Sequence, residues 1–233
     1  MLIPFFYGLH VAFPKGSMEV RMDKLLNAGL AKRNTTIEWR GYNGFINNKG
    51  VHGGVNRISK LRPQDSPVYV VRGGIDACIT GEDCIRERGL EDSLVEVAKI
   101  PLTRAGNSSV AISVFASATH TPWMKNINDL QQKITVVTEY PNIAERYFKE
   151  KGIDANINVC HGATEAIVAA GLAVLGVDVV DSGNTLEENG MNVIDTVITS
   201  STVLVTSKKE WSYSSSRAVL QDFVGMLLEE VDS

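Results

Sequence analysis

The order of strand-like and helix-like segments constrains this chain most. Short apolar runs that favour strands alternate with segments whose apolar residues recur at helical spacing, first over residues 9–115 and again over residues 133–206. Alternation of this kind predicts an α/β chain with a mostly parallel sheet. Because the pattern occurs in two blocks, we expect two lobes with a cleft between them.

The expected elements follow from these runs. Strands are predicted over residues 9–13, 57–61, 75–79, 95–100, 109–115, 133–138, 156–160, 173–180, 193–198 and 202–206. A first helix is expected to be capped by Ser17 and to end at Gly29, and others are expected over residues 67–72, 142–151, 163–170 and 219–231. Residues 41–54 are rich in glycine and asparagine and indicate an irregular loop or hairpin tip.

Composition excludes several classes of function. The net charge is −4, so the chain lacks the basic footprint expected of a nucleic-acid binder. No apolar run approaches the roughly 20 residues of a membrane span, and the apolar start is interrupted by Pro4 and has no basic region, unlike a signal peptide. Three cysteines fit a reducing compartment better than a disulfide scaffold, so we expect a cytoplasmic protein.

Polar segments stand at the carboxyl ends of four expected strands, where open α/β sheets bind ligands. These segments are Pro14-Lys15-Gly16, Thr80-Gly81-Glu82-Asp83, Thr138-Glu139-Tyr140-Pro141 and Asp181 to Thr185. Their shared position is a stronger signal than any one of them alone.

The last of these segments suits a sugar phosphate. A helix start offers backbone N–H groups to a dianion, Ser182 and Thr185 add hydroxyl donors, and Gly183 permits close approach. Asp178 and Asp181 would accept hydrogen bonds from a ribose diol. A plain strand–turn–helix connection with a good N-cap explains the same residues equally well.

Motifs of several common sites are absent. The chain has no P-loop, no dinucleotide fingerprint after a strand and no nucleophile elbow. Its four histidines and three cysteines show no metal-ligand spacing, so no protein-held metal is expected.

Six motifs occur in the order found in one enzyme family. They are AFPKG (12–16), LRPQDSPVYV (61–70), ITGEDCI (79–85), VVTEYPNIAERYFKEKGI (136–153), GATEAI (162–167) and VDVVDSGNTLEENGM (177–191). Together they resemble ATP phosphoribosyltransferase, and the length resembles the short form without a C-terminal regulatory domain. The resemblance implies a fold like type II periplasmic-binding proteins, with lobe I at residues 1–100 plus 189–233 and lobe II at residues 101–188.

The resemblance also implies an activity. The enzyme would transfer the 5-phosphoribosyl group of phosphoribosyl pyrophosphate (PRPP) to N1 of ATP and release pyrophosphate, which is the first step of histidine biosynthesis. Mg²⁺ would be bound through the substrate pyrophosphate. A homodimer and a regulatory subunit similar to histidyl-tRNA synthetase would be the protein partners.

Site residues carry over by motif. For PRPP, Ser182, Gly183, Asn184 and Thr185 would hold the 5-phosphate, while Asp178 and Asp181 would face the ribose. The residues implied for ATP are Lys15, Gly16, Arg62, Asp65, Glu82, Asp83, Thr138 and Tyr140. Lys15, Asp178 and Asp181 would act in catalysis. Taken from the sequence alone, Asp65 could equally be a helix cap, and Glu82 with Asp83 could serve a helix dipole.

The chain departs from the family pattern at two positions near these motifs. Ser17 stands where the family reads arginine, with Arg21 and Arg40 as candidate substitutes, and Glu139 stands where lysine or serine is frequent. These departures leave two alternatives open. One is a diverged phosphoribosyltransferase with another acceptor, and the other is a non-catalytic module that binds nucleotide or PRPP.

Overall fold

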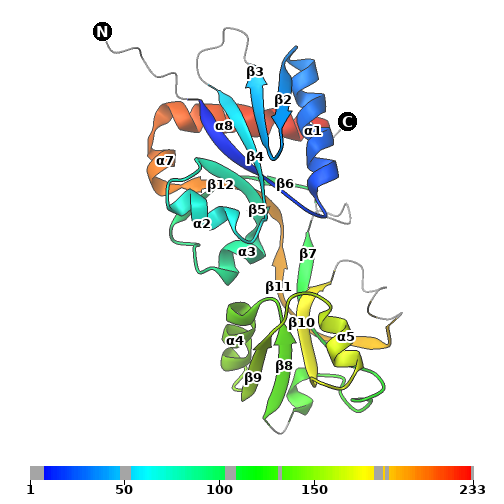
Figure 1. Cartoon of the computed structure of the whole chain (residues 1–233). Coiled ribbons are helices and arrows are strands. Elements are labelled where there is room, and N and C mark those ends of the chain that lie inside the picture. The colour runs from blue at the N-terminus through cyan, green and yellow to red at the C-terminus, as the bar shows by residue number, and fades with distance from the viewer. Residues whose placement is uncertain are drawn as a thin grey trace. The chain divides into compact units, whose positions relative to one another are not determined.

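A computed structural model describes residues 8–47, 54–102, 109–130, 133–180, 186 and 189–231. The chain divides into two compact units, the first formed by residues 1–108 with 201–233 and the second by residues 109–200. Each unit is a β-sheet flanked by helices (Figure 1). Within the described ranges, no helix has the length and apolar character needed to cross a membrane.

The first unit is built on a seven-stranded sheet in the order β2-β3-β4-β1-β5-β12-β6. Its strands are β1 (Leu9–Pro14), β2 (Thr36–Arg40), β3 (Asn43–Asn47), β4 (Val55–Leu61), β5 (Ala77–Gly81), β6 (Leu94–Ile100) and β12 (Thr202–Ser207). Its helices are α1 (Glu19–Lys32), α2 (Ser66–Val71), α3 (Glu82–Glu87), α7 (Lys208–Ser212) and α8 (Ser214–Val231). β1 pairs in parallel with β4 and with β5, so these three strands end at one edge of the sheet.

Alternation along β1 divides the core of this unit between two faces. Val11 and Phe13 pack in a cluster with α1 and α8, whereas Ala12 belongs to a separate cluster with α2 and α3. The two long helices lie close together, because a Cβ on Gly29 would come within 2.7 Å of the Met226 side chain.

The second unit has a five-stranded sheet in the order β11-β7-β10-β8-β9. Its elements are β7 (Val110–Ser117), the 3₁₀ turn η1 (Ile127–Asp129), β8 (Ile134–Thr138), α4 (Pro141–Glu150), β9 (Ala155–Val159), α5 (Thr164–Ala169), β10 (Leu175–Val180) and β11 (Met191–Ser200). β8 pairs in parallel with β9 and β10, so these strands also share an edge. α4 and α5 pack in separate core clusters, with Val136 and Val137 on opposite sides of β8.

The expectation of a mostly parallel sheet was wrong. Four of the ten strand pairings in the described ranges are parallel. The β2–β3–β4 meander and the strands β7, β11 and β12 supply the antiparallel pairs. Part of the glycine-rich segment expected to be a loop is strand β3, which is fixed by pairing with β2 and β4 on both sides.

Three further boundaries differ from the sequence-based expectation. Met18, not Ser17, is the N-cap residue of α1, and α1 continues through Gly29 to Lys32. Gly29 lies within the helix and does not end it, and the absence of a side chain there lets α8 approach closely. Residues 189–200 were expected in the first lobe, but β11 pairs along its length with β7 and so belongs to the second unit.

Candidate active site

Three predicted residues meet at the carboxyl edge of β1 and β4 in the first unit. The backbone N–H of Lys15 donates to the carbonyl of Leu61 at 2.8 Å, which holds the two strand ends together. Gly16 has φ +114°, and a Cβ placed on it would come 3.4 Å from Nη1 of Arg62. The edge therefore brings together one ammonium group, one guanidinium group and a stretch of exposed glycine backbone.

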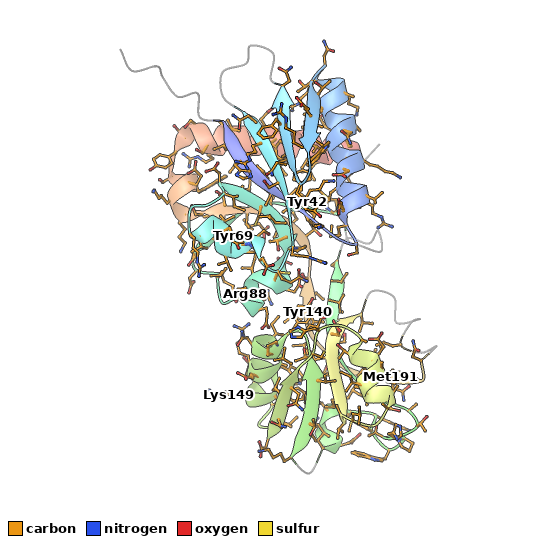
Figure 2. All side chains as sticks on the ribbon, in the orientation of Figure 1. Tyr42, Tyr69, Arg88, Tyr140, Lys149 and Met191 are labelled. Carbon is orange, nitrogen blue, oxygen red and sulfur yellow. The ribbon has the colours of Figure 1, made fainter. Side chains whose placement is uncertain are left out.

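An exposed aromatic ring extends this cluster. Nζ of Lys15 lies 3.9 Å from the ring centroid of Tyr42, which is 60% exposed (Figure 2). The carbonyl of Tyr42 accepts the N–H of Lys60 at 2.9 Å, so β4 anchors this turn. Such a ring can stack on a nucleobase while a neighbouring cation contacts phosphate. Tyr42 was not predicted from the sequence, where its only signal was an aromatic residue in a polar turn.

A half-buried ion cluster supports the Lys15–Gly16 turn. Nζ of Lys60, whose side chain is 12% exposed, lies 3.0 Å from Oε1 of Glu19 and 2.6 Å from Oδ2 of Asp23. Glu19 also accepts the N–H of Gly16 at 3.4 Å. The hydrogen bond from Lys60 lowers the pKa of Glu19. Burial alone would lower the pKa of Lys60, but its hydrogen bonds to Asp23 and Glu19 outweigh burial and raise it.

The acidic residues of this edge are engaged inside the protein. Glu82 accepts hydrogen bonds from Lys99 at 3.0 Å and from the N–H of Ser201 at 2.8 Å. Burial opposes ionisation, yet these hydrogen bonds keep the pKa of Glu82 below its usual value. Asp83 is buried and accepts from Sγ of Cys84 at 3.5 Å. Both carboxylates lie in the first turn of α3, where they favour the helix dipole.

Asp65 does not cap α2 with its side chain, although it occupies the N-cap position. Its Oδ1 instead pairs with Nη2 of Arg88 at 3.2 Å, and Nε of Arg88 donates to the carbonyl of Gln64 at 3.2 Å (Figure 2 labels Arg88). Arg88, missed in the sequence analysis, thus fixes the turn that follows Arg62.

In the second unit, Thr138 and Tyr140 form part of the framework at the edge of the sheet. The hydroxyl of Thr138 is fully buried, donates to the carbonyl of Val177 at 2.7 Å and accepts the N–H of Tyr140 at 2.8 Å. Tyr140, labelled at the start of α4 in Figure 2, is itself buried in the core. Their expected contact with nucleotide stays a prediction, and their visible contacts are structural.

Asp178 is the predicted PRPP residue that the structure describes. Its Oδ1 accepts the N–H of Val179 at 2.7 Å, and its Oδ2 accepts the hydroxyl of Thr164 at 2.7 Å. The strand β10 that carries it ends at Val180, directly before residues 181–185. Asp181, Ser182, Gly183, Asn184 and Thr185 lie outside the described residues, so their predicted roles stay predictions. Across the described part of the chain, no three His, Cys, Asp or Glu side chains gather as a metal site.

Comparison with known sequences decides the family. A family model described as HisG, ATP phosphoribosyltransferase, matches residues 62–229. The chain belongs to the ATP phosphoribosyltransferase family. An ATP phosphoribosyltransferase of Thermodesulfovibrio yellowstonii is 34% identical over 221 residues, covering 95% of this chain and 71% of that protein. One from Methanothermobacter thermautotrophicus is 30% identical over 216 residues, covering 92% and 69%.

Solved structures agree on the fold. The ATP phosphoribosyltransferase HisG:HisZ complex from Thermotoga maritima matches with a TM-score of 0.75 and 24% identity, covering 96% of this chain and 98% of that chain. The periplasmic aliphatic sulphonate binding protein SsuA from Escherichia coli matches with a TM-score of 0.61 and 14% identity, covering 97% and 72%. The prediction of a two-lobe fold like periplasmic-binding proteins is confirmed.

The family identified from the six motifs is likewise confirmed, and with it the assignment to the transferase that opens histidine biosynthesis. Lys15, Gly16 and Arg62 lie at one strand edge, and their expected contact with ATP stays a prediction. Thr164 was missed as a partner of Asp178, although it lies in the quoted GATEAI motif immediately after a strand end.

Proposed function

We propose that this chain transfers the 5-phosphoribosyl group of PRPP to N1 of ATP, binding PRPP at the β10 edge of the second unit. The observation that carries the proposal is the fixed carboxylate of Asp178, which lies three residues before Asp181 inside the segment matched by the family model. A carboxylate held in this way can accept hydrogen bonds from both ribose hydroxyls. Asp181 and the Ser182–Thr185 segment complete the proposed PRPP site.

The first unit supplies the proposed nucleotide-binding edge. Lys15 and Arg62 provide two cations beside the Gly16 backbone, a set that suits phosphate oxygens. Arginine offers a planar fork of donors and lysine a mobile point charge. The exposed face of Tyr42 adds a surface for the adenine ring.

The proposed reaction needs no covalent enzyme nucleophile. The bond from C1 of the ribose to the pyrophosphate oxygen breaks, and a bond from adenine N1 to C1 forms. Positive charge develops at C1 while negative charge grows on the departing pyrophosphate. Asp178 orients the ribose, and the cations Lys15 and Arg62 stabilise polyphosphate charge, so catalysis comes from positioning and electrostatics.

Mg²⁺ is proposed to be bound through the pyrophosphate of PRPP, where it would neutralise part of the charge on the leaving group. Mg²⁺ commonly keeps its waters and binds substrate phosphates together with one or two carboxylates. The donor set fits that mode, since no three ligand side chains gather within the described residues and Glu82 is already bound by Lys99 and Ser201. We also propose a cytoplasmic location, where ATP and PRPP are available.

A protein partner is part of the proposal. The HisG chain of the Thermotoga maritima complex is covered over 98% of its length, and that chain is solved together with HisZ. We propose that this enzyme forms a homodimer and binds a separate regulatory subunit of the same kind. Size-exclusion chromatography with light scattering, with and without a candidate subunit, tests both statements.

One observation favours a second candidate, a phosphoribosyltransferase with a different acceptor. Ser17 is exposed beside Gly16, where the family pattern has arginine. Arg40, one candidate replacement, bonds through Nε to Oε1 of Glu38 at 3.1 Å. An altered cation set at this edge would change the fit of the acceptor phosphates and leave the PRPP site intact.

The experiment is a product assay. The protein is incubated with PRPP, Mg²⁺, pyrophosphatase and one purine nucleotide at a time, and N1-phosphoribosyl product is sought by mass spectrometry. Product with ATP, strongly reduced in Asp178→Asn, supports the proposal. Product with another nucleotide alone supports the second candidate. PRPP binding by calorimetry without any product favours a non-catalytic module, and absence of PRPP binding removes the proposal.

A further inference from the structure

We propose that Thr164 is a positioning residue for PRPP, acting through Asp178. The inference rests on the proposed function, because it requires Asp178 to contact the ribose. Thr164 is the first residue of α5, and Asp178 lies near the end of β10, so the bond between them joins a helix start to the strand that carries the site.

The hydrogen-bond chain has a defined direction. The hydroxyl of Thr164 is fully buried and lies 2.7 Å from Oδ2 of Asp178 and 3.3 Å from Sγ of Cys160. Threonine has one hydroxyl proton, and an ionised carboxylate can only accept. The proton of Thr164 therefore goes to Asp178, and the thiol of Cys160 donates to Thr164. Three side chains from β9's end, α5 and β10 form one donor chain that ends on the carboxylate.

This chain, together with one backbone N–H group, fixes the carboxylate of Asp178. Oδ1 of Asp178 is held by the N–H of Val179 at 2.7 Å and Oδ2 by Thr164, so rotation about the side chain breaks at least one hydrogen bond. Each carboxylate oxygen can accept a second hydrogen bond. Asp178 is half-buried, in contrast to Thr164, so its outer side can meet a ligand while its inner side is braced.

Backbone conformation aims Thr164 at β10. Ala163 adopts the left-handed region at φ +52°, after Gly162 at φ +92°. Among non-glycine residues in the described ranges, only Asn34 shares a positive φ. A left-handed alanine costs roughly 1–2 kcal/mol, so the surrounding structure must hold it there. The turn brings the start of α5 against β10, and it thereby places the buried hydroxyl of Thr164 beside Asp178.

The test compares Thr164→Val and Thr164→Ser with a matched control. Thr121→Val removes another buried threonine hydroxyl of the same unit, which donates to the carbonyl of Ser117 at 2.7 Å and does not touch Asp178. We expect Thr164→Val to raise the Kd and KM for PRPP roughly tenfold, since hydrogen bonds to charged groups are among the stronger ones. The KM for ATP should stay unchanged. Thr164→Ser should restore PRPP affinity, and Thr121→Val should lower the melting temperature alone.

The possible outcomes distinguish failure of the inference about Thr164 from failure of the proposed function. If Thr164→Val lowers the melting temperature but binds PRPP like the wild type, Thr164 is structural and the inference is overturned. If Thr164→Val fails to fold, Cys160→Ala is tested instead. Because this variant loses only a weak S–H donor, we expect its Kd for PRPP to be about two- to threefold higher than that of the wild type. An unchanged Kd would overturn the inference. If the wild type binds no PRPP, the proposed function fails instead. Weaker PRPP binding in Asp178→Asn but not in Thr164→Val leaves the function standing and removes only Thr164.

Discussion

The ammonium group of Lys15 lies over the exposed ring of Tyr42, 3.9 Å from its centroid. Lys15 follows β1 and Tyr42 lies in the turn between β2 and β3, so the contact ties the β2–β3 hairpin to the proposed nucleotide-binding edge. The turn between these strands thus belongs to the candidate site.

Removing the Tyr42 ring should weaken nucleotide binding moderately. An exposed cation–π contact contributes about 0.5–1 kcal/mol, which corresponds to a two- to fivefold effect. We expect Tyr42→Ala to raise the KM for ATP by at least this factor, measured at saturating PRPP, and Tyr42→Phe to behave like the wild type. Equal effects of the two variants would show that the hydroxyl, and not the ring, is what matters.

Adding one methyl group at Gly16 should fill space beside Arg62 that the proposed site leaves for a phosphate. The new Cβ would lie 3.4 Å from Nη1 of Arg62, and alanine is strained at φ +114°. Gly73→Ala is a matched control, because Gly73 has φ +73° with nothing within 4 Å of the added atom. Both variants should lose roughly 1–2 kcal/mol of stability in urea unfolding. Only Gly16→Ala should lower kcat/KM for ATP, and an equal loss in Gly73→Ala would contradict the placement of Arg62.

Replacing Lys60 by methionine should destabilise the first unit and change its response to acid. Glu19 has a lowered pKa, so its contribution is present above its ordinary value of 4.5 and is lost as pH falls through the folded-state pKa. In Lys60→Met, the loss of stability that accompanies protonation of Glu19 should therefore be smaller. Urea unfolding at pH 7 should show a deficit of about 1–3 kcal/mol, less than for a fully buried pair because water reaches both carboxylates. A deficit that is the same at pH 7 and at pH 3.5 would refute the linkage.

His10 should make stability fall in mild acid. Burial, and then the charge of Arg57, lowers the pKa of His10 from 6.5 to about 4. The neutral ring meets the hydroxyl of Ser59 at 2.7 Å. Since the unfolded chain takes up this proton first, the stabilising contribution is complete above pH 6.5 and is lost as pH falls towards 4. His10→Gln should have a shallower decline in unfolding free energy over that interval, and parallel curves would count against this account.

Strand ends were the most predictable part of the molecule. The strand ends at Leu61 and Thr138 were predicted correctly, and β1 ends at Pro14, one residue beyond the predicted strand, because apolar alternation and turn residues are local properties. The meeting of Lys15, Gly16 and Arg62 followed from two parallel strands sharing an edge. Local pattern thus located the elements and one half of the proposed site.

Residues whose role depends on a distant partner were not predictable. Gly29 resembles a helix terminator until Met226 is seen against it, and β3 resembles a loop until β2 and β4 pair with it. Thr164 gains its importance from Asp178, fourteen residues further along the chain. Thr138 and Tyr140 looked like ligand contacts, yet their visible bonds are to the protein framework.

The position of β12 has a consequence for how the chain is made. This strand lies between β5 and β6, and among the described strands β6 pairs with no other, yet β12 is synthesised only after the whole of residues 109–200. On the ribosome the second unit can finish folding while the first still exposes the edges of β5 and β6. Unpaired edges of this kind invite pairing with other chains. A protein interrupted before Thr202 would therefore carry a complete second unit and a first unit unable to close its own sheet.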